Sequence, residues 1–335
     1  MRKLTFPIVA LLAAFGGCGE KQSPLEPQSV GEVSLEALTV VDVASEYSAT
    51  ILTPLPGAER MLARAINADG HIVGWAMVDD MMHPVVWEDG QPRELPLSAW
   101  SEGQALDINS TGDIVGFDDE LGAVMWKNGE LIALGVQTIG SLAWAINERG
   151  QVVGNKEYET SPPEVLGFLW RHGQLSVLPQ LGDSPDCSAL DINEAGQIVG
   201  QCSSRACLWD DGSVVDLGVD SDNSVAWAIN SRGQVVGYAS PTGGGSSAFV
   251  WRDGVAEDLL TLGGLRTSAS DINDAGQIVG SSQTPAGQRH AVTWKHGQLI
   301  DLGLAGSTSS SALGIDNQGR IVGYAGQSAV IWERQ

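Results

Sequence analysis

One segment of the chain has oxygen-bearing side chains at the spacing of a calcium-binding loop. Asp107 begins it, and further oxygen-bearing residues follow at its third, fifth, seventh and twelfth positions. The same segment recurs elsewhere with Ala145 and Arg149 in place of two of these ligands. The segment therefore forms without them, and Asn109 and Gly112 account for it as a tight turn. We expect a structural turn here, with no metal and no cofactor.

Carboxylates in the variable stretches of the chain could supply the acid and the base of a glycosidase. These stretches hold Asp79, Asp119, Asp183 and Asp222. In a chain with 41 acidic residues and only 18 Lys and Arg, such groups are more often simply solvated charge. The sequence contains no Gly-x-Ser-x-Gly, His-Glu-x-x-His, Cys-x-x-Cys or phosphate-binding glycine loop. We therefore expect a non-enzymatic protein, and a hydrolase or lyase that uses loop carboxylates is the alternative.

Three cysteines remain beyond the N-terminal segment, which permits one disulfide and one free thiol in an exported protein. If Ser204 and Arg205 form the turn between two strands, Cys202 and Cys207 lie opposite each other, at a separation that a disulfide spans. Cys187, on the preceding strand, competes for Cys202. We predict the disulfide between Cys202 and Cys207.

The 11 tryptophans fall into two groups. Seven recur at one position of a repeated unit, where packing between neighbouring elements explains them better than ligand stacking does. Trp75, Trp100, Trp144 and Trp227 stand outside that position, and only Trp100 lies in a variable connection. With other residues of the variable stretches, the predicted ligand-binding set is Asp79, His83, Trp100, Asp119, Tyr158, Asp183, Asp222 and Arg289.

These residues must be positioned by a unit that returns seven times. Residues 145–154 show it clearly, as Ala-Ile-Asn-Glu-Arg-Gly-Gln-Val-Val-Gly. Each copy continues to a Trp followed three residues later by Gly, except that the chain ends soon after the last Trp. The period of roughly forty residues is typical of propeller blades.

Each unit divides into four short strands. The first ends at Ile-Asn, the second contains Val-Gly, the third ends at the Trp and the fourth resembles residues 131–135. Asn at the first position and Gly at the fourth suit a type I turn between the first two strands. Seven such units predict an all-β fold, a seven-bladed β-propeller of four-stranded antiparallel blades.

The ends of the repeat region indicate how the ring closes. The last unit lacks a fourth strand, whereas residues 49–57 precede the first unit and resemble one. We predict that this N-terminal strand pairs with the Trp332 strand and closes residues 48–335 into a single domain. Short uniform connections alternate with variable ones along the chain, so the variable connections share one face, where we expect the binding residues.

The repeats resemble those of the HAF family of bacterial extracellular proteins. In that family Ala-x-x-Ile-Asn-x-x-Gly-x-Val-Val-Gly is followed by His-Ala-Phe-x-Trp-x-x-Gly and a Leu-x-x-Leu-Gly tail. Residues 290–294, His-Ala-Val-Thr-Trp, and 248–251, Ala-Phe-Val-Trp, match its naming triplet most closely. The resemblance covers about residues 48–335 and implies an exported repeat protein, without a general activity that can be transferred.

The N-terminus reads as an export signal. A basic start precedes an apolar stretch that is too short to span a bilayer comfortably. Residues 15–18, Phe-Gly-Gly-Cys, resemble the bacterial lipobox, which implies removal of residues 1–17 and lipid attachment at Cys18. In Gram-negative lipoproteins, an Asp directly after the lipidated Cys signals retention in the inner membrane. Residue 19 is Gly instead, so the outer membrane is the expected destination. Residues 18–47 form the lipidated tether.

The formal net charge of −23 disfavours nucleic acid and anionic lipid head groups as partners. Membrane contact is therefore expected through the N-terminal lipid alone. The sequence predicts a monomeric, lipid-anchored binding or scaffold module of the cell envelope, with a protein or a glycan as its partner. A purely structural envelope protein is a third hypothesis.

Overall fold

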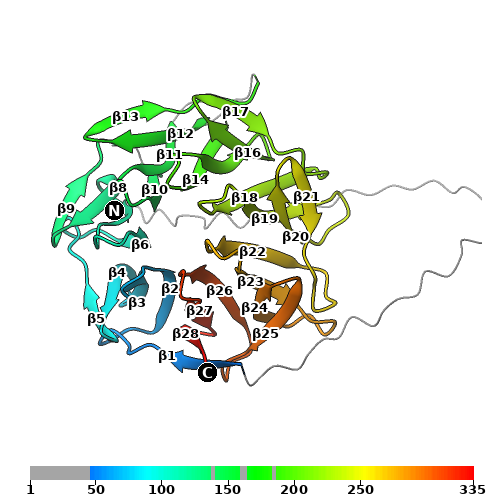
Figure 1. The fold of residues 1–335 in the computed structure, drawn as a ribbon. Helices are drawn as coiled ribbons and strands as arrows, with labels where there is room; N and C mark the ends of the chain where they lie inside the picture. Colours follow the sequence, from blue (N-terminus) through cyan, green and yellow to red (C-terminus); the bar gives the residue numbers. More distant parts are fainter. Residues whose placement is uncertain (1–45, 137–139, 159–163, 183–185) are drawn as a thin grey trace, which may run out of the picture. The chain divides into compact units, whose positions relative to one another are not determined.

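The computed structural model describes residues 46–136, 140–158, 164–182 and 186–335. These residues form 28 strands in seven four-stranded antiparallel sheets, which stand around a common axis (Figure 1). The predicted seven-bladed β-propeller is confirmed. In the described part of the chain, no helix is long and apolar enough to cross a membrane.

The blades follow one another along the sequence. The first four blades contain β2 (Arg60–Ile66), β3 (Ile72–Val78), β4 (Met81–Glu88) and β5 (Gln91–Glu94); β6 (Gly103–Ile108), β7 (Ile114–Asp118), β8 (Gly122–Lys127) and β9 (Glu130–Ala133); β10 (Leu142–Ile146), β11 (Val152–Tyr158), β12 (Glu164–Arg171) and β13 (Gln174–Val177); and β14 (Cys187–Ile192), β15 (Ile198–Cys202), β16 (Arg205–Asp210) and β17 (Ser213–Asp216). The last three contain β18 (Asn223–Ile229), β19 (Val235–Ser240), β20 (Ser247–Arg252) and β21 (Val255–Asp258); β22 (Thr267–Ile272), β23 (Ile278–Gln283), β24 (Arg289–Lys295) and β25 (Gln298–Gly303); and β26 (Ser310–Ile315), β27 (Ile321–Ala325), β28 (Ser328–Arg334) and β1 (Tyr47–Ile51).

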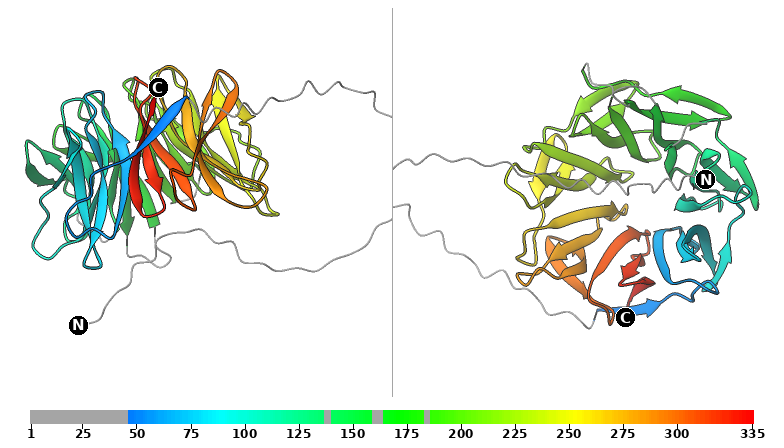
Figure 2. Two further views of the ribbon diagram at one scale, coloured as in Figure 1. Left: turned by 90° about the horizontal axis from the view of Figure 1, so that it is seen from below. Right: turned by 180° about the vertical axis from the view of Figure 1, so that it is seen from behind.

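Within each blade, consecutive strands pair as a meander, and the first strand lies nearest the axis. The first strands of neighbouring blades contact one another around the ring. Because successive strands are antiparallel, the Asn turns and the turns after the third strand share one face, which we call the Asn face. The remaining connections lie on the opposite face, which we call the loop face (Figure 2). This separation follows the pattern of short and variable connections in the sequence.

The repeated Asn forms a hydrogen-bonded ring on the Asn face. Its side-chain oxygen accepts a backbone N–H four residues ahead, as from His71 to Asn67 at 2.9 Å. Its amide nitrogen donates to the backbone carbonyl at the equivalent position of the next blade, at 2.9–3.3 Å, in the order Asn67, Asn109, Asn147, Asn193, Asn230, Asn273 and Asp316. The residue therefore both forms the turn and joins neighbouring blades.

The last blade replaces this Asn with Asp316, and an arginine completes the ring. Arg320 Nε lies 2.5 Å from Asp316 Oδ2. Arg320 Nη2 donates to the carbonyl oxygens of Asn67, at 3.2 Å, and Ala68, at 2.9 Å. The seventh blade is thereby bonded to the first.

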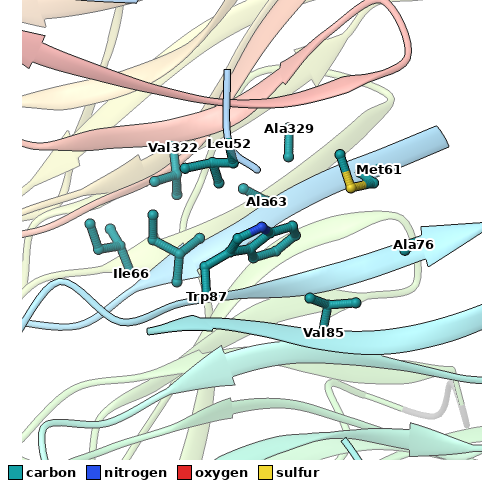
Figure 3. Close-up of a cluster of buried hydrophobic side chains, with 10 residues drawn as sticks. Leu52, Met61, Ala63, Ile66, Ala76, Val85, Trp87, Val322 and Ala329 are labelled. Atoms are coloured by element: carbon teal, nitrogen blue, oxygen red, sulfur yellow. The ribbon is translucent and has the colours of Figure 1, made fainter. Parts of the chain in front are cut away.

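The recurrent tryptophans pack between blades, as predicted. Trp87, Trp126, Trp209, Trp294 and Trp332 are at most 4% exposed. Trp87 illustrates the packing in Figure 3, where it lies among side chains of blade one and close to Val322 and Ala329 of blade seven. Its indole N–H donates to the Thr53 carbonyl at 2.8 Å. Burial of each such ring contributes roughly 2–3 kcal/mol.

Strand β1 supplies the outer strand of the seventh blade. It pairs with β28 in an antiparallel register that places Ala49 opposite Trp332. Leu52, which follows it, donates its backbone N–H to Ala329 and packs into the core between blades seven and one (Figure 3). The two ends of the described chain thus share one sheet.

The predicted disulfide between Cys202 and Cys207 is wrong, because Cys202 is bonded to Cys187. The turn between β15 and β16 consists of Ser203 and Ser204, both with positive φ, and not of the pair one residue later. The pairing of β15 with β16 therefore leaves Cys207 opposite Gly200, whereas the pairing of β14 with β15 places Cys187 directly opposite Cys202. Cys207 is a buried free thiol, and burial raises its pKa.

Candidate functional site

Every blade has a β-bulge in its first strand. The pairing register with the second strand shifts by one residue just before the Ile-Asn turn in all seven copies. The unpaired residues at these bulges are Arg64, Leu106, Trp144, Leu190, Trp227, Ser270 and Leu313. A bulge re-aims the side chain that it contains, and six of these seven residues line the central channel.

The glycine of the repeated Val-Gly pair makes this bulge possible. A Cβ atom added to it in any blade would lie only 1.8–2.0 Å from a carbonyl oxygen of the first strand. In blade four, for example, the Cβ of residue 200 would lie 1.9 Å from the Ser188 oxygen. Glycine is therefore required here by close backbone approach.

The channel contains a cavity of about 480 Å³. Its walls come mainly from the first and second strands of the blades, and Ser246, Arg266 and Arg289 line it at the ends that face the loop face. A volume in this range is typical of small-molecule sites. The cavity thus extends from the bulges toward the loop face.

The first, second, third and fifth blades line the cavity mainly with aromatic and aliphatic side chains, together with Arg64 and Gln104. The apolar ones include Leu62, Trp75, Leu106, Trp144 and Trp227. The rings of Trp144 and Trp227 meet edge to face, with centroids 6.3 Å apart and planes inclined by 69°. Such an aromatic pair is favourable beyond its area burial, and the two rings support each other's orientation.

The opposite side is rich in hydroxyl groups and carries two arginines. Blades six and seven supply Ser268, Ser270, Ser281, Ser311 and Tyr324, together with Arg266 and Arg289. Arg289 Nη1 donates to the Tyr324 hydroxyl at 3.2 Å. The backbone of Arg266 is fixed by a bridge to Ser246 and by the Gln283 N–H, which donates to its carbonyl at 2.8 Å. Two guanidinium groups from one blade therefore line the same cavity.

Three partly buried carboxyl groups, those of Asp107, Asp191 and Asp271, lie close to the bulges in alternate blades. One oxygen of Asp107 accepts the N–H of Ile108 and the other accepts that of Ile146 in the next blade, both at 2.8 Å. Asp191 and Asp271 make the equivalent bonds to their own and the following blades. Asp107 therefore joins two blades, beside the turn that Asn109 forms.

The environment of these carboxyl groups favours their neutral form. Burial raises the pKa of Asp107 to about 7, of Asp191 to about 8 and of Asp271 to about 6, although the backbone N–H groups act in the opposite direction. Arg64 lies among them. Burial lowers the pKa of its guanidinium, and the three carboxylates oppose that shift. The pKa of Arg64 therefore depends on how many of the three carboxyl groups are ionised.

Of the predicted ligand-binding residues whose side chains the structure describes, Arg289 alone lines the cavity. Asp79 lies in the turn between β3 and β4 on the loop face and is exposed. His83 lies on β4 with its Nδ1 2.7 Å from Glu94 Oε1 of β5, on the outer side of the first blade. Trp100 is 96% exposed in the connection between β5 and β6. These three residues are not brought together with the channel.

Asp119 and Asp222 also lie outside the cavity lining. Asp119 accepts the Glu102 N–H at 3.0 Å, and Asp222 accepts the Thr242 N–H at 2.7 Å, so both tie loops together. Tyr158 ends β11. Asp183, like Cys18, falls outside the described residues.

The sequence contained a signal for the channel residues. The Ile, the turn Asn and the Val-Gly pair hardly change between copies, whereas the bulge position holds arginine, leucine, tryptophan or serine. The residue after the Val-Gly pair varies in the same way, and its copies Trp75, Tyr238 and Tyr324 also line the cavity. A residue that varies between otherwise similar copies is not required for folding of the blade, so it is a candidate for a functional role.

Comparison with known proteins gives the class of fold. The fold is similar to that of a streptogramin B lyase, with a TM-score of 0.57 and 10% identity over 87% of this chain and 98% of that one. A catalytically inactive virginiamycin B lyase from Staphylococcus aureus, solved with quinupristin, matches at 0.53 and 9% identity over 86% and 99%. A puromycin-hydrolyzing peptidase from Mycobacterium tuberculosis matches at 0.57 and 11% identity, over 85% of this chain and 54% of that one.

At these identities the likeness concerns the fold alone. No protein-family model matches the sequence. No curated protein matches it either.

Proposed function

We propose that this protein is a non-enzymatic binding module that takes a small ligand, such as a short glycan, into its central channel from the loop face. The observation that carries this proposal is the cavity of about 480 Å³, which has an aromatic side and a hydroxyl-rich side. Small-molecule sites combine apolar surface with a few placed polar groups in this way. The binding site is then built by the blade walls rather than by the tips of the variable loops.

The roles of the nearby titratable groups support binding over catalysis. Asp107, Asp191 and Asp271 each accept two backbone N–H groups and join neighbouring blades, so their carboxyl oxygens already have partners. The cavity lining itself consists of aromatic, aliphatic, hydroxyl, amide and guanidinium side chains. These groups suit recognition by shape and hydrogen bonding.

A binding screen with a paired turnover measurement tests the function. The purified full-length protein is titrated with a panel of short glycans and peptides, and each mixture is followed for product formation. Binding without turnover is expected, and conversion of any bound compound would favour the hydrolase or lyase instead. Trp227→Ala should abolish binding, whereas Trp100→Ala, which removes an exposed indole outside the cavity, should leave it unchanged. The reverse result would place the site on the loops.

The proposed cellular setting is the outer membrane, with lipid attached at Cys18. The lipobox-like Phe-Gly-Gly-Cys at residues 15–18 supports it. Several acyl chains, each CH₂ contributing about 0.8 kcal/mol, anchor a protein stably. Cells grown with labelled palmitate should label the native chain and not Cys18→Ala, and the label should fractionate with outer membranes. An unlabelled native chain would refute the anchor.

A further inference from the structure

We infer that the channel ligand is an acidic sugar, a short glycan that carries a carboxylate, held with its ring faces against the tryptophans and its carboxylate on Arg266 and Arg289. This inference rests on the proposed function and names the class of ligand. The observation behind it is that aromatic rings, hydroxyl groups and guanidinium groups all line the same cavity.

The aromatic side fits the apolar faces of sugar rings. Trp75, Trp144 and Trp227 come from three different blades, and all three line the cavity. Trp75 is only 9% exposed and the guanidinium carbon of Arg60 lies 5.4 Å from its ring centroid, so the partly buried Trp144 and Trp227 present most of the ring surface to a ligand. Rigid, broad side chains give contact area at a low cost in conformational entropy. They are positioned before a ligand arrives.

The hydroxyl groups of blades six and seven indicate a ligand with many polar atoms. Ser268, Ser270, Ser281 and Ser311 line the cavity, and Gln104 lies on its wall. Within the described residues, the four serine hydroxyls make no side-chain hydrogen bond to the protein. Each can donate one hydrogen bond and accept two. A polyhydroxylated sugar would use this capacity, whereas a purely aromatic ligand would leave it unused.

The two mouth arginines supply a positive charge that the protein does not neutralise. Arg266 and Arg289 are exposed, and within the described residues neither forms a salt bridge. Arg64 differs, because three carboxyl groups surround it. Guanidinium groups bind carboxylates through paired hydrogen bonds, with a geometry that lysine lacks. The mouth is therefore suited to a carboxylate on the ligand.

The strongly acidic surface does not oppose this assignment. At physiological ionic strength, charges more than about 8 Å apart are largely screened from each other. The net charge of −23 still disfavours an extended polyanion, which would contact the surface at many points. It leaves a short ligand with one or two carboxylates free to reach the arginines.

A matched set of acids and esters tests the inference. The full-length protein is titrated by calorimetry with disaccharides of galacturonate, glucuronate, mannuronate and guluronate, and with the methyl ester of each. The ester keeps the sugar skeleton and removes the charge. At least one acid should bind about tenfold or more tightly than its ester, because hydrogen bonds between charged groups exceed neutral ones by that order.

Substitutions separate the charge from the ring contact. The double variant Arg266→Gln with Arg289→Gln should lose the preference for the acid while keeping the weaker binding of the ester. Trp227→Leu should weaken binding of acid and ester alike. Arg252→Gln is the matched control, since Arg252 is an exposed arginine at the Asn-face end of β20 in the neighbouring blade. Its affinities should equal those of the native protein.

The outcomes distinguish this inference from the proposed function. Equal binding of acids and esters, or an acid preference that survives the double arginine variant, would overturn the acidic ligand and leave a neutral ligand in the same channel. Failure of every acid and ester to bind, while another compound of the wider screen binds in a manner that depends on Trp227, would also overturn it. Failure of all compounds in both experiments would overturn the proposed function as well.

Discussion

Each repeat contains residues that stabilise the backbone of the blade and a residue that lines the channel. The repeated Asn and Gly satisfy the backbone, because the Asn bonds its own turn and the next blade, and the Gly admits the bulged strand. The bulge residue then carries the chemistry of the channel, as Trp144 and Trp227 do. A side chain can vary at the bulge because the scaffold places no demand on it.

Replacement of Gly200 by alanine tests the close backbone approach. The added Cβ would lie 1.9 Å from the Ser188 carbonyl oxygen, which belongs to backbone and cannot move aside cheaply. We expect a loss of about 3 kcal/mol in the free energy of unfolding, the upper range for overpacking. Urea denaturation followed by circular dichroism measures it. Gly243→Ala is the control, because a Cβ there meets open space, and an equal loss in both variants would contradict the explanation.

The cysteines give a second prediction at this scale. The Cys187–Cys202 disulfide spans 15 residues, and a loop of that length contributes about 3 kcal/mol. The double variant Cys187→Ala with Cys202→Ala should lose about that much, and dithiothreitol should destabilise the native protein but not the variant. Because Cys207 is buried with a raised pKa, iodoacetamide should label it only in denaturant. Peptide mapping that links Cys202 to Cys207 would contradict this pairing.

At the scale of elements, the Asn-face hairpins are joined into a ring and not merely stacked. The Asn of each hairpin donates one side-chain hydrogen bond to the next blade. Asp316 has no amide to donate, so the bond from the seventh blade to the first comes from Arg320 instead. The closure of the propeller therefore uses two separate devices. One is the outer strand β1 beside β28, and the other is this arginine on the Asn face.

The Arg320→Ala variant isolates the second device. It removes the partner of Asp316, whose side chain is 2% exposed, and the bonds to the first blade. A buried carboxylate without its partner is costly, so we expect a loss of about 3 kcal/mol in unfolding free energy. Arg171→Ala, at an exposed end of β12, should change it by less than about 0.5 kcal/mol. Equal melting temperatures for the two variants would show that the arginine does not close the ring.

The repeat also sets what could be predicted from the sequence. The strands, turns and blade number follow from local chemistry that is repeated seven times, such as Asn at the start of a turn and Gly at its end. The disulfide prediction is wrong because the turn is Ser203–Ser204 and not Ser204–Arg205, which moves Cys207 away from Cys202, while Cys187 faces Cys202 from the other neighbouring strand. The sequence does not show that Trp144 and Trp227 face the channel, because a bulge breaks the alternation by which a strand sorts its two faces. The disulfide partner and the orientation of the tryptophans both depend on how the strands are aligned with one another, which a short stretch of sequence does not determine.

At the scale of the whole molecule, the sign of the charge differs between the surface, the channel mouth and the region of the bulges. The surface is strongly acidic, the channel mouth carries Arg266 and Arg289, and the region of the bulges holds Arg64 among three carboxyl groups from alternate blades. Blades one, three and five have Ala65, Ala145 and Ala228 at the position of those carboxyl groups. The fold therefore does not require them, and their effect can be measured separately from folding.

These carboxyl groups should make the propeller less stable as pH rises from about 4 to about 8. Burial raises the pKa values of Asp107, Asp191 and Asp271 to about 7, 8 and 6, whereas in the unfolded chain they are near 3.9. Between these limits the folded state binds more protons than the unfolded state, so the unfolding free energy falls with increasing pH. Desolvation is the main cause, and proximity of the carboxyl groups adds to it at Asp107 and Asp191.

The substitution Asp191→Ala separates this effect from general repulsion on an acidic surface. Chemical denaturation at a series of pH values from 5 to 8.5 should show a shallower decline for the variant than for the native chain, by about 4 kcal/mol over the range. The variant also loses the bond from Ile229 to Asp191, which lowers its stability at every pH without changing the slope. Asp253→Ala, an exposed aspartate in a turn of the Asn face, should leave the slope as it is. Identical slopes for all three proteins would mean that Asp191 titrates normally and that its burial does not govern the stability of the ring.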